Sequence, residues 1–74
     1  MSKRLLAKIE MNGAEYRITH DDKAKRNPYR IVRKWYVPSL GWRSETKERY
    51  VDYKSCLYWI AEEANLYGRN HITG

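Results

Sequence analysis

The pattern that most constrains this chain is a pair of alternating apolar rows that meet at Asn12-Gly13. Apolar residues occupy every second position on both sides of this dipeptide: Leu5, Ala7, Ile9 and Met11 before it, and Ala14, Tyr16 and Ile18 after it. Alternation with a period of two predicts strands, and Asn-Gly favours a two-residue type I′ turn. Such a turn sets Met11 opposite Ala14, so that both rows share one face. We therefore predict a β-hairpin over residues 5–20.

A second hairpin is predicted over residues 29–51, after a polar connection that ends at Pro28. Its turn is the tetrapeptide 38–41, where Pro38 suits a turn position and Gly41 can adopt positive φ. With Val37 opposite Trp42, one face carries most of the large side chains, and we expect this face to join the core. Its members are Tyr29, Ile31, Trp35, Val37, Trp42 and Tyr50, with Arg33 and Glu48 near the margin.

A helix is predicted over residues 53–67, because Asp52 can cap its first turn and an apolar stripe follows. The stripe consists of Tyr53, Leu57, Ile60, Ala61 and Ala64, with Cys56 and Trp59 on its flank. Gly68 is a candidate for the residue that ends the helix, and residues 69–74 are expected to form a tail.

Together these elements predict an α+β fold with the order ββββα. A small antiparallel sheet of three to four strands, made of the two hairpins, packs on one face against the C-terminal helix. The chain has 74 residues, which is too short to divide a core between two units, so we expect a single domain over residues 1–74. The other face of the sheet stays open to solvent.

Positive charge is concentrated in the middle of the chain. Residues 23–49 hold nine Lys or Arg and two Glu, and nine minus two gives +7, which exceeds the net charge of +6 for the whole chain. In the assumed register, most of these charges fall on the open face of the second hairpin. That face is expected to carry Arg30, Val32, Lys34, Tyr36, Arg43, Glu45, Lys47 and Arg49. A pairing shift of one residue would exchange the two faces, and a β-bulge would redirect part of a strand.

This composition predicts a nucleic-acid-binding module, with DNA ahead of RNA. The expected contacts are Arg30, Lys34, Tyr36, Arg43, Lys47 and Arg49, with additional contacts from Lys23, Lys25, Arg26 and Trp42. The hairpin could enter the major groove as a ribbon, or Tyr36 could stack on an unpaired base. In architecture alone, a sheet with one helix is similar to the arm-type DNA-binding domains of tyrosine recombinases, and this resemblance favours duplex DNA.

Two other interpretations compete with nucleic-acid binding. The face could be a solvated surface in which Lys34 opposite Glu45 is an ordinary cross-strand pair, although one Glu cannot neutralise five cations and Arg30 faces Arg49. Alternatively, the chain could be an interaction or inhibitor protein that docks on an acidic protein surface, for example that of a nucleic-acid-handling enzyme. Small single-domain proteins of that kind are common in phages and mobile elements.

The sequence indicates neither an enzyme nor a cofactor or metal site. Cys56 falls on the expected buried flank of the helix, and neither His20 nor His71 belongs to a recognisable catalytic or zinc pattern. A single cysteine and the lack of a long apolar run or signal-peptide core fit a cytoplasmic protein. The expected state is a monomer or a weak homodimer, because the sheet leaves an open edge.

Overall fold

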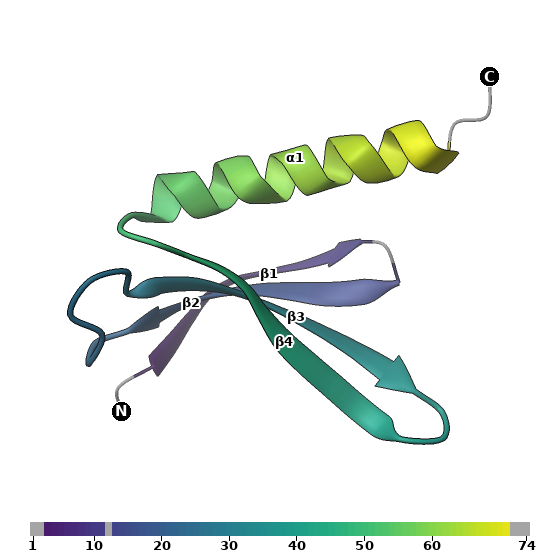
Figure 1. Ribbon diagram of the computed structural model, residues 1–74, viewed down its shortest axis with the longest axis horizontal. Helices are drawn as coiled ribbons and strands as arrows, with labels where there is room; N and C mark the ends of the chain where they lie inside the picture. Colours follow the sequence, from purple (N-terminus) through teal and green to yellow (C-terminus); the bar gives the residue numbers. More distant parts are fainter. Residues whose placement is uncertain (1–2, 12, 72–74) are drawn as a thin grey trace.

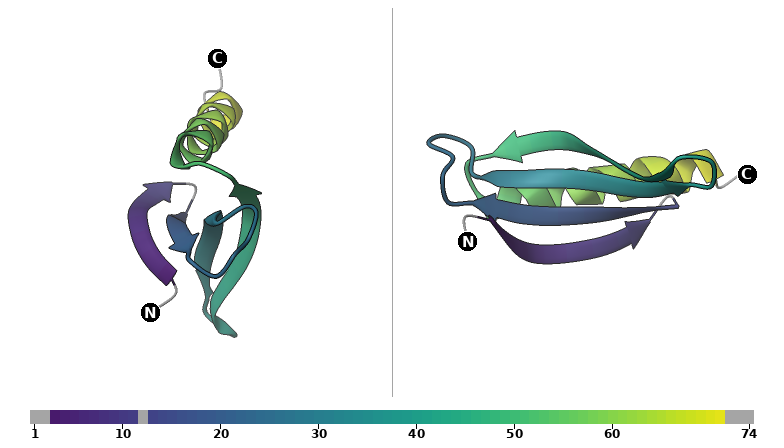
Figure 2. Two further views of the ribbon diagram at one scale, coloured as in Figure 1. Left: turned by 90° about the vertical axis from the view of Figure 1, so that its left-hand side faces the viewer. Right: turned by 90° about the horizontal axis from the view of Figure 1, so that it is seen from below.

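The computed structural model describes residues 3–11 and 13–71 and confirms the ββββα order. The strands are β1 (Lys3–Met11), β2 (Ala14–Asp21), β3 (Tyr29–Val37) and β4 (Gly41–Tyr50), followed by the helix α1 (Tyr53–His71). They form one antiparallel meander in the order β1-β2-β3-β4. Figure 1 shows α1 lying across one face of this sheet, and Figure 2 shows the opposite face, which has no helix over it.

The first hairpin pairs as its sequence pattern predicts near the turn. Met11 lies opposite Ala14, and Gly13 has φ of 68°, a left-handed conformation that glycine adopts without a steric cost. Further along β1 the prediction is wrong for Leu5. Leu5 pairs with Thr19 and Ala7 pairs with Ile18, so Leu6 is an extra residue that moves Leu5 out of the core-facing row.

The core lies between the sheet and the first half of α1. The buried side chains come from β2, β3 and α1, and they are Ala14, Tyr16, Ile18, Ile31, Cys56 and Ile60. Ile18 and Ile31 are cross-strand partners and are fully buried. Partly buried aromatic residues pack around this centre, including Trp35 and Trp59, which the sequence places in the core.

Asp52 caps α1 as predicted, because the backbone N–H of Ser55 donates a hydrogen bond of 2.9 Å to Asp52 Oδ1. Hydrogen bonding from the Ser55 side chain, then from its backbone N–H, together with the nearby Lys54, holds the pKa of the Asp52 carboxyl below its usual value.

The buried stripe of α1 differs from the predicted one. Leu57 is exposed, as are Ala61 and Ala64, whereas Cys56 and Ile60 are buried. This rotation of the helix brings the large Trp59 ring to 6.0 Å from the Tyr16 ring, and an indole buries more apolar surface than two alanine methyl groups.

The predicted end of the helix is also wrong, because helical backbone continues through Gly68 to His71. A glycine inside a helix costs only about 1 kcal/mol. No proline follows to force an end, and part of the predicted tail is therefore helical. Residues 72–74 of that tail lie outside the described residues.

Candidate functional site

In the second hairpin, the register of the two strands near the turn differs from the one that the sequence predicts. The backbone N–H of Leu40 donates to Val37 O over 2.9 Å, which closes a tight turn and brings Gly41, with φ of 84°, opposite Val37. The predicted pairing of Val37 with Trp42 is therefore wrong. At the other end of the hairpin, Tyr29 pairs with Tyr50 as predicted. The two ends differ by one residue in register.

An irregularity at Lys47 absorbs this difference. Ile31 lies opposite Glu48 and Val32 lies opposite Thr46, so Lys47 is the extra residue of β4. Beyond a bulge, each side chain of the strand lies on the opposite face of the sheet from the one expected without the bulge. Here this reversal affects the half of β4 that leads to the turn. The placement of Arg43 and Glu45 on the open face is consequently wrong. Both pair with β3 residues of the helix-side row, Arg43 with Trp35 and Glu45 with Arg33.

Trp42 moves in the opposite direction, from the predicted core face to the open face. It pairs with Tyr36, and the two rings form an edge-to-face contact with centroids 5.5 Å apart and planes at 69°. Both side chains remain largely exposed, Tyr36 at 57% and Trp42 at 65%. We refer to Tyr36 and Trp42 as the aromatic tip, because they lie beside the turn where the hairpin projects past the rest of the sheet (Figure 1).

Of the six principal predicted contact residues, the sheet brings together four on the open face. Arg30, Lys34 and Tyr36 alternate along β3, and Arg49 lies opposite Arg30 on β4. Arg43 lies on the helix-side face, and Lys47 sits at the bulge, where its ammonium is 3.0 Å from Glu45 Oε1. Arg33, also on the helix side, places its guanidinium carbon 4.6 Å from the centre of the Trp35 ring.

The second hairpin alone would give the open face a large excess of positive charge. β2 reduces this excess, because it contributes carboxylates to the same face. Arg30 lies 2.9 Å from Asp21 Oδ2, and both side chains are mostly buried. Asp21 thus supplies the negative charge that the facing pair of Arg30 and Arg49 requires. Within the described chain, neither Lys34 nor Arg49 forms an ion pair, so these two cations remain available to an external anion.

The three additional basic residues, Lys23, Lys25 and Arg26, lie in the exposed connection between β2 and β3. Asp21 shapes this connection, since its side chain accepts from the backbone N–H of Lys23 over 3.0 Å and its carbonyl accepts from Ala24 over 3.1 Å. The connection is at the opposite end of the sheet from the β3–β4 turn (Figure 1). These cations therefore extend the open face away from the aromatic tip.

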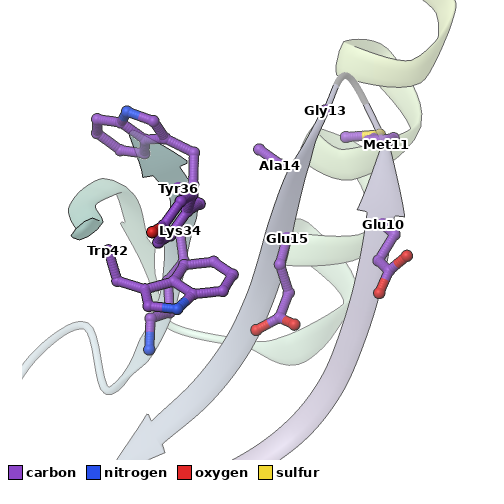
Figure 3. A pocket seen from close by; sticks show the side chains of 9 residues that line it. Glu10, Met11, Gly13, Ala14, Glu15, Lys34, Tyr36 and Trp42 are labelled. Carbon is purple, nitrogen blue, oxygen red and sulfur yellow. The ribbon is translucent and has the colours of Figure 1, made fainter. Parts of the chain in front are cut away.

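A shallow pocket of about 420 Å³ separates the ends of the two hairpins. The ladder between β2 and β3 ends at the pair of Glu15 and Lys34, and the pocket lies where the strands part. Figure 3 shows Lys34 and the aromatic tip grouped on one side, with Glu15 and Glu10 on the neighbouring strands. Sequence reasoning did not single out either carboxylate, because the signal lies in the pairing of β2 with β3, which neither hairpin turn specifies.

Glu15 is the more constrained of the two carboxylates. Its side chain is 17% exposed, Arg17 Nε donates to its Oε2, and Lys8 Nζ lies 3.9 Å from its Oε1. Glu10 lies opposite Glu15 on β1 and is exposed. The pocket thus combines a fixed carboxylate, an ammonium group and two exposed aromatic rings.

The part of the chain that the structure describes gives little support to a metal site, a reactive cysteine or a membrane-spanning helix. It contains no group of three or more His, Cys, Asp or Glu that could hold a metal ion. Cys56 is fully buried, and burial raises the pKa of its thiol, which disfavours the reactive thiolate. Within the described residues, no helix is long and apolar enough to cross a membrane.

Comparison with known proteins identifies no relative: the chain matches no protein-family model, no curated protein and no solved structure. The fold and the open face therefore define only a class, a small α+β domain with one uncovered sheet face. The arm-type resemblance, which rests on architecture alone, gains no support from these comparisons.

Proposed function

We propose that this protein is a small nucleic-acid-binding module that binds single strands through the open face of the sheet. The observation that carries the proposal is the aromatic tip, Tyr36 and Trp42, exposed on the same face as Arg30, Lys34 and Arg49. Exposed aromatic rings offer stacking surfaces to unpaired bases, and neighbouring cations follow the phosphates. Such stacking contributes about 1–3 kcal/mol per base.

The bulge favours this mode over insertion of the hairpin into the major groove of a duplex. Groove readout relies on arginine side chains that reach guanine edges from one face of a ribbon. In this hairpin Arg43 lies on the helix-side face and Arg30 is engaged by Asp21. The residues left at the projecting end are aromatic. In a duplex the bases stack on one another, so their faces are not available to such rings.

The spacing of the cations suits an extended strand. Arg49 lies opposite Arg30, which is six positions before Tyr36 on β3, and a strand rises about 3.3 Å per residue, so the unpaired cations and the aromatic tip define a track of about 20 Å. Arg49 lies beside Arg30 at one end, Lys34 lies near the other, and the basic connection after β2 continues beyond Arg30. The strand would pass from that connection to the aromatic tip.

The experiment that tests this function is fluorescence anisotropy with labelled single-stranded DNA, single-stranded RNA and duplex DNA at two salt concentrations. We expect both single strands to bind more tightly than the duplex, with an affinity that falls as salt rises. The double variant Tyr36→Ala/Trp42→Ala should bind single strands at least about tenfold more weakly.

The matched control is Tyr58→Ala, because Tyr58 is an aromatic residue on α1 that is 65% exposed, as Trp42 is. This variant should keep the affinity of the unaltered protein. Equal losses in the control and in the double variant would contradict stacking at the aromatic tip, and preferential binding to the duplex would favour groove reading instead.

A second candidate function is docking on an acidic protein surface through the same face. Aromatic residues and arginine dominate the binding energy of protein interfaces, and Leu40 adds an exposed apolar side chain beside the aromatic tip. Absence of binding to every nucleic acid at low salt would overturn the first proposal and leave this one.

A further inference from the structure

The pocket between the hairpin ends raises a question that phosphate binding does not answer. Glu10 and Glu15 both line it, yet carboxylates repel phosphates. Arg17 and Lys8 leave lone pairs of the Glu15 carboxylate free to accept further hydrogen bonds. On a single strand the donors are the amino and imino groups of the bases, together with the 2′-hydroxyl groups in RNA. The carboxylates of this pocket are therefore suited to a base.

Building on the proposed function, we propose that this pocket selects an unpaired guanine from the bound strand. The base would stack on the aromatic tip and present its Watson–Crick edge to Glu15 and Lys34. The imino and exocyclic amino groups of guanine would donate to the Glu15 carboxylate, and its carbonyl oxygen would accept from the Lys34 ammonium.

The arrangement of the two side chains supports guanine over the other bases. Glu15 and Lys34 are cross-strand partners on the open face, so an acceptor group and a donor group come from neighbouring positions that both line the pocket. Guanine presents two adjacent donors followed by one acceptor, which matches one carboxylate and one ammonium group. Adenine and cytosine each present one amino donor next to a ring-nitrogen acceptor, and thymine presents one donor between two carbonyls, so each leaves one carboxylate oxygen without a donor.

Glu15 is prepared for this role by its neighbours. Arg17 and Lys8 hold the carboxylate in place, which reduces the conformational entropy lost when a ligand binds. A carboxylate offers about four lone-pair positions, so the bond from Arg17 Nε to Oε2 leaves positions on both oxygens for a base. The pocket volume of about 420 Å³ is within the range of roughly 300–1,000 Å³ typical of ligand pockets.

The test uses labelled oligothymidine strands that carry one central guanine, adenine, cytosine or inosine. We expect the strand with guanine to bind about tenfold more tightly than those with adenine or cytosine. Inosine lacks the exocyclic amino group of guanine but keeps its imino group and carbonyl oxygen. The inosine strand should therefore bind several-fold more weakly than the guanine strand, and this comparison uses the unaltered protein.

Glu15→Gln should remove the preference for guanine while leaving the binding of plain oligothymidine nearly unchanged. Glu48→Gln is the matched control, because it removes the same charge from β4 on the helix-side face, away from the pocket. Thermal unfolding of both variants would establish that they are folded.

The outcomes separate this inference from the proposed function. Equal binding of all four strands, or a guanine preference that survives in Glu15→Gln, would overturn the guanine pocket and leave single-strand binding in place. Failure of every strand to bind would overturn both.

Discussion

The two hairpins are similar in length but differ in what they contribute. In β2 every second side chain from Ala14 to Ile18 is buried, whereas in β4 the whole run from Trp42 to Arg49 is exposed. The cause is the position of α1, which packs on the central strands β2 and β3, while the end of the second hairpin bends away from it (Figure 1). One helix covers only part of a twisted sheet, so β2 and the start of β3 supply the core and the end of the second hairpin is free to bind.

The two hairpins also use their irregularities differently. In β1 the extra residue, Leu6, lies at the far end of the strand from the turn, and the core-facing row from Ala7 to Met11 is intact. In β4 the extra residue, Lys47, exchanges the faces of the half that leads to the turn, and this places Trp42 next to Tyr36. The same kind of irregularity displaces only Leu5 from the core-facing row of one hairpin and creates the aromatic tip in the other.

The largest expected effect is on the free energy of unfolding, and it distinguishes a core residue from a residue of the aromatic tip. Ile18→Ala removes a fully buried side chain and should lower the free energy of unfolding by about 2–5 kcal/mol. Trp42→Ala removes a larger but exposed side chain whose main contact is the Tyr36 ring, and it should lower the free energy of unfolding by about 1 kcal/mol or less. Urea unfolding followed by circular dichroism measures both changes. A large loss in the Trp42 variant would contradict the division of roles between the core and the aromatic tip.

A smaller effect tests which face of the second hairpin binds. Lys34→Gln and Arg43→Gln each remove one positive charge, but Lys34 lies on the open face and Arg43 on the helix-side face. The Lys34 variant should bind single-stranded DNA several-fold more weakly, and the slope of log affinity against log salt should decrease by about 0.7. The Arg43 variant should retain the original slope. Anisotropy titrations across a salt series give both values, and the reverse order would place binding on the other face.

The smallest effect concerns the cap that joins the second hairpin to α1. The pKa of Asp52 is lowered in the folded protein, so its contribution to stability is present above its unfolded pKa of about 3.9 and is lost as pH falls through the lower folded value. Asp52→Asn keeps a capping acceptor but cannot titrate. Its thermal midpoint should therefore fall less than that of the unaltered protein between neutral pH and pH of about 3. Identical pH profiles would show that the Asp52 charge contributes nothing.

Local signals explain which predictions succeed. The alternation from Ala7 to Ile18, the turn chemistry of Pro38 and Gly41, and the Asp52 cap each involve residues close in sequence, and all are confirmed. The predictions that fail concern which of several neighbouring residues is buried in the helix, or which is paired in the sheet. The buried stripe of α1 shifts to Cys56 because Trp59 packs on Tyr16. The register near the β3–β4 turn shifts by one residue because the backbone N–H of Leu40 donates a hydrogen bond to Val37 O.

The candidate site was predicted only in part for the same reason. Arg30, Lys34, Tyr36 and Arg49 were assigned to the open face correctly, since they lie on β3 or on the side of the bulge where the assumed register holds. Arg43 and Trp42 lie beyond the bulge, and their faces were exchanged. The carboxylates of Asp21 and Glu15 were missed because they approach the site from β2, across a pairing that no turn sequence specifies.

By itself the sequence determined the element order, the two turns, the start of the helix and the concentration of positive charge, because these follow from residues adjacent along the chain. The tertiary structure alone decided which side chains share the open face. Within the β3–β4 ladder, the tight turn and the pairing of Tyr29 with Tyr50 at the other end have registers that differ by one residue, and the extra residue at Lys47 reconciles them. A one-residue difference reverses the face of every side chain beyond it, so the tight turn, accommodated by the bulge at Lys47, determines which face carries Trp42.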